Sequence, residues 1–236
     1  MRNISCFIGL IFFTISINAQ EFIYQETIDL DSDGDSEIIK IELIQGTYYQ
    51  FILKIADQEI RDTLGEGING FQIIDIDKTD KYKEIAVHSS GPSNDDEYKI
   101  YWYDGDTIKK MAFIERWPTF LGNGIVYVDN WEGFWTKRDK YLLNKNDRTL
   151  DHIPQFAYYI GIKIRVENSF TIYREKDLKD EVALLSKYSE IELLLCDTEK
   201  KEGDKYLYLI KSESGLVGWT RSDVLIKNTT GINWAD

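Results

Sequence analysis

The residues best suited to chemistry lie in an acidic stretch, DLDSDGDSEIIKIEL, at positions 29–43. Its carboxylates crowd together within nine residues and repel one another unless a cation compensates them. Calcium takes about six to eight oxygen ligands, so it needs several carboxylates that converge from a sharp turn, which Gly34 can supply. The predicted metal ligands are Asp29, Asp31, Asp33, Asp35 and Glu37. The alternative is a metal-free turn in which Asp side chains cap their own backbone.

A second acidic stretch repeats this plan about 46 residues later in IIDIDKTDKYKEIAVHSS. Asp75 and Asp77 precede Glu84 and an apolar run, and we predict them as ligands of a second, weaker calcium site. This stretch has no turn glycine and carries two extra residues before Glu84. A period of about 45 residues is typical of one four-stranded unit in a repeat protein. We find no convincing third copy, and VYVDNWEGFW at 126–135 is the nearest candidate.

The first stretch resembles a known calcium loop. It begins like an EF-hand, but its twelfth position is Lys40 instead of Glu and a strand-like run follows, which excludes that motif. Asp29, Asp31, Asp33, Gly34 and Glu37 instead resemble the loop of FG-GAP and VCBS-type repeats, D-x-D-x-D-G-x-x-D/E followed by a strand. The resemblance implies a structural calcium ion in a repeated β unit.

The elements that must position these residues are predicted to be strands almost throughout. Short apolar or alternating runs rich in Ile, Val, Tyr and Phe recur between turn residues, as in EIIKIELI and YKIYWYDG. The one plausible helix covers 177–188, a segment equally compatible with a loop and a strand. The polar stretch 144–156 marks the domain boundary. We predict an all-β chain with a partial, propeller-like antiparallel sheet domain at 20–150 and a small barrel at 160–228.

The C-terminal part resembles a bacterial SH3 domain. Gly215, Gly218 and Trp219 match the G-x-x-G-W motif near the end of that family's domain, and Leu225 matches the leucine that closes it. The resemblance implies a small SH3-like barrel with an aromatic groove for peptides. The sequence departs from the family at Leu207, where a Trp is usual, and this departure leaves ligand binding open.

Aromatic side chains in a turn-rich region are the second candidate site. Trp117, Trp131 and Trp135 can form a platform for a glycan or a protein, because aromatic rings give large contact area at low entropy cost. The alternative is that these side chains are buried, either at the base of the sheets or where the sheets contact the second domain.

The N-terminus predicts a secreted or periplasmic protein. One basic residue, Arg2, precedes an apolar run and then Ala19, which is the pattern of a signal peptide over 1–19, cleaved after Ala19. An uncleaved anchor is the alternative. The remaining 236 − 19 = 217 residues carry 28 − 1 = 27 basic and 41 acidic side chains, which argues against nucleic acid as a partner. No later run reaches transmembrane length. Cys196 alone remains, so no internal disulfide is expected.

No catalytic constellation accompanies these features, and we do not expect an enzyme. His88 and His152 lie far from each other and from any Cys at metal spacing. A triad with Ser89 fails because adjacent strand residues point to opposite faces. The expected function is non-enzymatic binding of a peptide, glycan or protein at the cell envelope. The alternatives are a purely structural, degenerate repeat protein and a hydrolase with unrecognised acidic residues.

Overall fold

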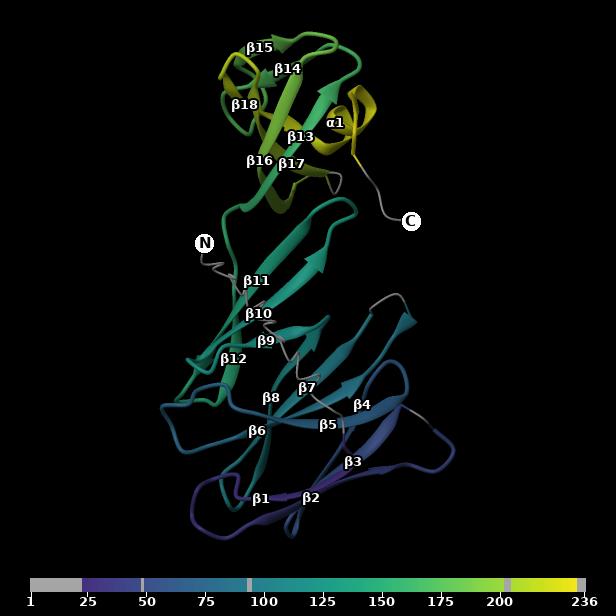
Figure 1. Cartoon of the computed structure of the whole chain (residues 1–236), viewed down its shortest axis with the longest axis vertical. Helices are drawn as coiled ribbons and strands as arrows, with labels where there is room; N and C mark the ends of the chain where they lie inside the picture. Colours follow the sequence, from purple (N-terminus) through teal and green to yellow (C-terminus); the bar gives the residue numbers. More distant parts are fainter. Residues whose placement is uncertain (1–22, 48, 93–94, 202–204, 233–236) are drawn as a thin grey trace, which may run out of the picture.

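A computed structural model of the chain describes residues 23–47, 49–92, 95–201 and 205–232. The predicted signal peptide lies outside these residues. Across the described ranges the chain forms three four-stranded antiparallel sheets, one seven-stranded curled sheet and one short helix, which confirms the predicted all-β class. Figure 1 shows an elongated molecule with the seven-stranded sheet at one end and the first sheet at the other.

The three small sheets share one plan, in which four successive strands run up and down in chain order. The first sheet contains β1 (Gln25–Ile28), β2 (Glu37–Leu43), β3 (Gln50–Ile55) and β4 (Gln58–Thr63). The second contains β5 (Ile68–Ile74), β6 (Glu84–Ser89), β7 (Glu97–Tyr103) and β8 (Ile108–Glu115). The third contains β9 (Pro118–Phe120), β10 (Ile125–Trp131), β11 (Thr136–Asn144) and β12 (Thr149–Ile153).

The third sheet is a third unit of the same plan, for which we found no convincing copy in the sequence. In place of an acidic loop, its first two strands are joined by the short segment 121–124, whose Gly122 and Gly124 have positive φ. The stretch 126–135 does belong to this third unit, as β10 and the turn after it. The polar stretch 144–156 contains the last turn and β12, so the third sheet ends at Ile153.

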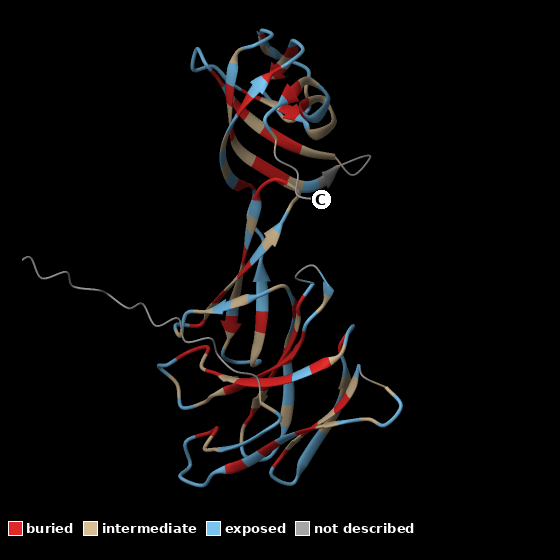
Figure 2. Ribbon diagram, turned by 45° about the vertical axis from the view of Figure 1, so that its right-hand side comes forward, coloured by how far each residue is buried: buried red, intermediate tan, exposed pale blue. Residues whose placement is uncertain are grey.

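Burial explains the strand patterns. In β2 the side chains of Ile39 and Ile41 are buried and alternate with exposed Ile38 and Lys40, because one face of the first sheet meets a core. All six residues of β6 are buried instead, because the second sheet lies between two cores. One core joins it to the first sheet and the other joins it to the third. Figure 2 shows buried residues mainly along the strands and exposed residues mainly in the loops.

The seven-stranded sheet follows the order β15-β14-β18-β17-β16-β13-β19. Its elements are β13 (Tyr158–Val166), β14 (Phe170–Tyr173), β15 (Glu181–Leu185), β16 (Glu190–Lys201), β17 (Lys205–Ser212), β18 (Val217–Arg221) and β19 (Thr229–Thr230). The helix α1 (Ser222–Asn228) sits between β18 and β19 and buries Leu225. The segment 177–188 forms turns and β15, so the structure selects the strand alternative there. In the part of the chain that the structure describes, no helix has the length and apolar character needed to cross a bilayer.

Candidate metal centre

The first acidic loop (residues 29–37) joins β1 to β2 and is shaped by its own side chains. Leu30 is fully buried and anchors the loop to the core, while its N–H donates to Glu37 Oε2 at 2.8 Å. The backbone N–H of Gly34 donates to Asp29 Oδ2 at 3.1 Å, and Gly34 adopts φ +101°. A side chain at that φ would be strained, so the glycine permits the turn that folds the carboxylates back onto one another.

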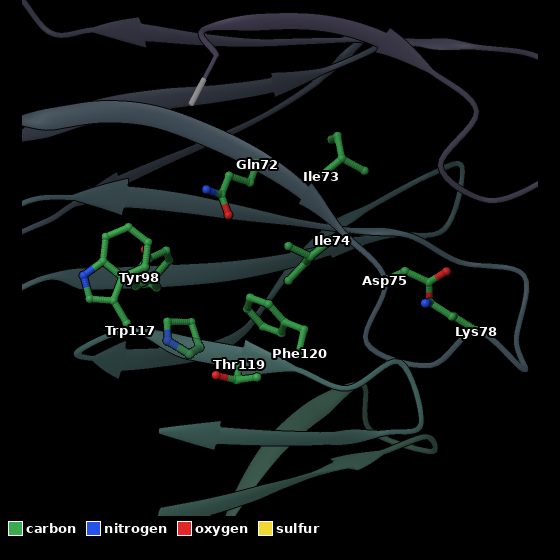
Figure 3. Close-up of a pocket in the computed structure, with 10 residues that line it drawn as sticks. Gln72, Ile73, Ile74, Asp75, Lys78, Tyr98, Trp117, Thr119 and Phe120 are labelled. Atoms are coloured by element: carbon green, nitrogen blue, oxygen red, sulfur yellow. The ribbon is translucent and has the colours of Figure 1, made fainter. Parts of the chain in front are cut away.

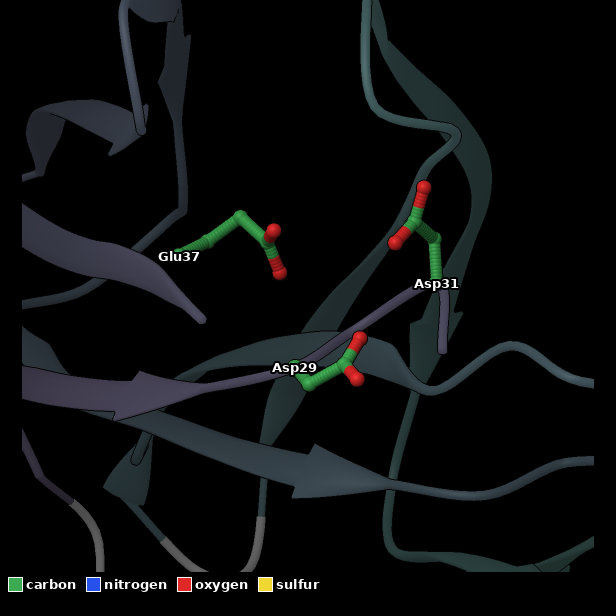
Figure 4. A group of neighbouring side chains, drawn as sticks. All are labelled: Asp29, Asp31 and Glu37. Atoms are coloured by element: carbon green, nitrogen blue, oxygen red, sulfur yellow. The ribbon is translucent and has the colours of Figure 1, made fainter. Parts of the chain in front are cut away.

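Three carboxylates of this loop converge. One oxygen from each of Asp29, Asp31 and Glu37, the acidic trio, lies within 4.8 Å of the others, and Figure 4 shows the three side chains pointing toward a shared space. Asp31 is only 4% exposed, and Oδ1 of Asp29 and Oδ1 of Asp31 are buried without a hydrogen-bond partner. A buried carboxylate oxygen without a partner is costly, and the trio could hold a metal ion that offsets this cost.

The other two predicted ligands lie outside this group. Asp33 and Asp35 are exposed, and Asp33 Oδ1 accepts the backbone N–H of Asp35 at 2.8 Å. Asp33 therefore stabilises the turn, as the metal-free interpretation of an Asp-rich loop expects. The structure thus brings together Asp29, Asp31 and Glu37 of the five predicted ligands.

The turn between β7 and β8 of the second sheet forms the opposite wall of the trio. Asp31 Oδ2 lies so close to Gly105 that a Cβ there would sit 3.0 Å from it. The hydroxyl of Tyr103 donates to the carbonyl of Gly105 at 2.6 Å. Burial raises the pKa of Tyr103, and the negative charges of Glu37 and Asp31 raise it further. The trio therefore sits at the junction of two sheets, in a negative field.

This arrangement suits a hard cation. The trio offers only oxygen atoms, which Ca²⁺ binds at about 2.3–2.6 Å, and atoms separated by up to 4.8 Å can contact one such ion together. The ammonium of Lys83 reaches the backbone oxygen of Asp29, at 3.5 Å. A bound ion would offset the charge of the trio and tie the loop to the neighbouring turn.

The second acidic loop (residues 75–84) joins β5 to β6 and has the same backbone scaffold. Ile76 is fully buried, and its N–H donates to Glu84 Oε2 at 3.0 Å, as Leu30 donates to Glu37. Its acidic side chains differ in their partners. Lys145 Nζ lies 2.5 Å from Asp77 Oδ2, and Arg148 Nη1 lies 2.7 Å from Asp80 Oδ2. Both cations come from the β11–β12 turn of the third sheet.

Local charges and burial separate the pKa values in this loop. The hydrogen bond from Lys145, together with those from Thr79, lowers the pKa of Asp77 to about 2. Burial raises the pKa of Glu84 to about 7, although its hydrogen bond from the Ile76 N–H opposes the shift. Burial also raises the pKa of Asp75, the third predicted ligand here. At neutral pH the second loop therefore holds an ionised Asp77 that already has its own cation.

The three predicted tryptophan ligands have different surroundings. Trp117 and Trp131 are each 50% exposed, whereas Trp135 is 3% exposed. The hairpin between β10 and β11 carries Trp135 and Phe134 into the core of the seven-stranded sheet, where the Phe134 and Tyr208 rings are 6.0 Å apart. Trp135 therefore connects the third sheet to the seven-stranded sheet, which is the alternative stated for it above.

Trp117 borders a groove of about 590 Å³ between the second and third sheets. Figure 3 shows β5 residues on one side and Trp117, Thr119 and Phe120 on the other. Asp75 and Lys78 lie at the far end from Trp117. The groove therefore combines apolar walls with charged groups, which suits an amphipathic ligand.

Beside this groove lies a buried pair, His88 and Asp96, which the sequence suggested only as part of a catalytic triad that we did not expect. His88 Nε2 lies 2.9 Å from Asp96 Oδ1, and the His88 ring lies 4.7 Å from the Tyr98 ring and 5.3 Å from the Trp117 ring. Burial lowers the pKa of His88 more than Asp96 raises it. The sequence offered His88 and Asp96 eight residues apart around a Gly-Pro turn, a weak signal without the fold.

Comparisons with protein-family models, with curated proteins and with solved structures found no match to this chain. The resemblances to FG-GAP/VCBS repeats and to bacterial SH3 domains therefore stay predictions.

Proposed function

We propose that this chain is a secreted or envelope-associated, non-enzymatic binding protein with one structural Ca²⁺ in its first acidic loop. The proposed architecture is a partial propeller of three four-stranded units followed by an SH3-like barrel. The observation that carries the ion is Asp31, which is 4% exposed, has a buried Oδ1 without a partner and faces two other carboxylates. Such a group is expensive to bury as a bare charge, and an ion removes that cost.

The proposed ion has a structural role. Glu37 begins β2, Asp29 directly follows β1, and Asp31 packs against Gly105 of the second sheet. Because these ligands come from both ends of one loop, an ion among them closes the loop. It also offsets the repulsion between the loop and the acidic turn beside it. The binding surface proposed for a peptide, glycan or protein is separate, in the region of the exposed Trp117 and Trp131.

Thermal unfolding with and without calcium tests the ion. At a Ca²⁺ concentration about 100 times the dissociation constant, linkage predicts a gain of roughly 2.7 kcal/mol over the chelated protein. Asp31→Asn should abolish this gain. Asp57→Asn removes the same charge from the exposed β3–β4 turn and should leave the gain unchanged. Equal melting temperatures of the wild type in calcium and in chelator would overturn the proposal.

Co-sedimentation with purified, insoluble cell-wall material tests the envelope ligand. The wild type should pellet with the wall, and Trp117→Ala should pellet less, because the exposed ring supplies contact area. Leu216→Ala is the matched control, since it removes an exposed apolar side chain of the seven-stranded sheet's turn. A wild type that stays in the supernatant would exclude this ligand class.

A further inference from the structure

The two acidic loops meet their neighbouring sheets in the same way. The carbonyl of Leu30 accepts the N–H of Lys83 at 2.8 Å, and the carbonyl of Ile76 accepts the N–H of Gly124 at 2.7 Å. Lys83 and Gly124 each directly precede the second strand of the next sheet. The first loop is therefore docked on the second sheet as the second loop is docked on the third.

The turns that face the two loops also correspond. In the β7–β8 turn, Asp104 Oδ1 accepts the N–H groups of the second and third residues after it, at 3.1 and 2.8 Å. In the β11–β12 turn, Asn144 Oδ1 accepts the equivalent two N–H groups, at 3.1 and 3.3 Å. Gly105 and Lys145 each directly follow that capping residue. The strand pairs that close the two turns, Tyr103 with Ile108 and Asn144 with Thr149, are offset by one residue from this alignment.

The residue that follows the cap differs between the two turns, and the difference lies beside the acidic groups. Gly105 places only its backbone against Asp31 Oδ2. Lys145 extends its ammonium to 2.5 Å from Asp77 Oδ2 and 3.5 Å from Thr79 Oγ1. Asp77, like Asp31, is nearly fully buried, at 3% exposed. At the first junction the ammonium of Lys83 reaches the backbone oxygen of Asp29, whereas at the second the ammonium of Lys145 contacts a buried carboxylate.

We propose that Lys145 is a tethered cation that takes the place of a divalent ion in the second acidic loop. This inference rests on the proposed Ca²⁺ of the first loop. It implies that the native chain binds one ion, and that the second loop becomes a divalent-cation site once Lys145 is removed. The oxygens that contact the Lys145 ammonium belong to Asp77 and Thr79. Glu84, at the end of the same loop, has an Oε1 that is buried without a partner.

Counting bound Ca²⁺ per chain by isothermal titration calorimetry and native mass spectrometry tests the inference. The wild type should bind one ion, Lys145→Gly two, and Lys145→Arg one, because arginine keeps the charge. Lys145→Gly combined with Asp77→Asn should return to one ion. Circular dichroism checks that each variant is folded, and Lys145→Met is the substitute if the glycine variant unfolds.

The two proposals fail in different ways. Lys145→Gly combined with Asp31→Asn isolates the second loop and should bind one ion. If the wild type binds none while this double variant binds one, the first site is overturned and the second loop's latent site stands. If folded Lys145→Gly and Lys145→Met bind no more ions than the wild type, the tethered-cation inference is overturned, whatever the first loop does.

Discussion

The first and second acidic loops share a scaffold but differ in how their charge is compensated. Each buries one aliphatic residue, Leu30 or Ile76, whose N–H is held by the glutamate that begins the next strand. Around that scaffold, the β7–β8 turn presents Asp104 and Asp106, whereas the β11–β12 turn presents Lys145 and Arg148.

The scaffold that shapes the loops is shared, whereas the charges of the facing turns differ, so loop folding and ion binding depend on different residues. The buried aliphatic residue and the glutamate hydrogen bond shape the loop in both places, although the surrounding charges differ. Under our proposals, the facing turn decides whether the buried aspartate is neutralised by the chain or by a dissolved ion. Two acidic loops of similar sequence would then differ in metal dependence because of one side chain on the neighbouring sheet.

Truncating the shared scaffold should have the largest effect, and it should be equal in the two loops. Leu30→Ala and Ile76→Ala each remove a fully buried side chain and should lower the free energy of unfolding by about 3–4 kcal/mol. Urea unfolding measures both losses. Ile38→Ala, on the exposed face of β2, is the control and should change little. A large loss in one loop alone would show that the scaffolds are not equivalent.

Local patterns predicted much of this arrangement. The strands were recognisable from their apolar patterns. An alternating run indicates a strand buried on one face, as in β2, and a continuous run indicates a strand buried on both faces, as in β6. The convergence of Asp31 and Glu37 was predicted because both lie in one short loop. The contact between Lys145 and Asp77 was not predicted, because the two residues are brought together only when the third sheet packs against the second. The third unit was missed because its second strand begins with Ile125, where those of the earlier units begin with Glu37 and Glu84.

The pH dependence of stability should come next in size, and it belongs to the second loop. The folded pKa of Glu84, about 7, exceeds its ordinary value of 4.5, so the folded chain binds this proton more tightly than the unfolded chain. Stability should therefore fall as pH rises from about 4.5 to 7, by about 3 kcal/mol for the whole shift. The charges near Glu84 are Asp80, Arg148 and Asp75.

Glu84→Gln should flatten this dependence, because glutamine keeps an oxygen for the Ile76 N–H and does not titrate. Denaturant unfolding between pH 4.5 and 8 measures the slope. Glu66→Gln, at an exposed position, is the control and should retain the wild-type slope. If Glu84→Gln keeps that slope as well, Glu84 is not the group responsible.

The smallest predicted effects have opposite signs in the two loops, which makes them the sharpest test of the comparison. In chelator, Asp77→Asn removes the charged partner of Lys145 and should destabilise the chain by about 2 kcal/mol. Asp31→Asn relieves repulsion within the acidic trio and should stabilise the chelated chain by about 1 kcal/mol. Denaturant unfolding in chelator and again in excess Ca²⁺ measures both changes relative to the wild type. In excess Ca²⁺, Asp31→Asn should become destabilising, because the wild type gains a bound ion and the variant does not. Asp77→Asn should remain destabilising. If both variants destabilise the chelated chain equally, the two aspartates have the same compensation and the contrast between the loops is wrong.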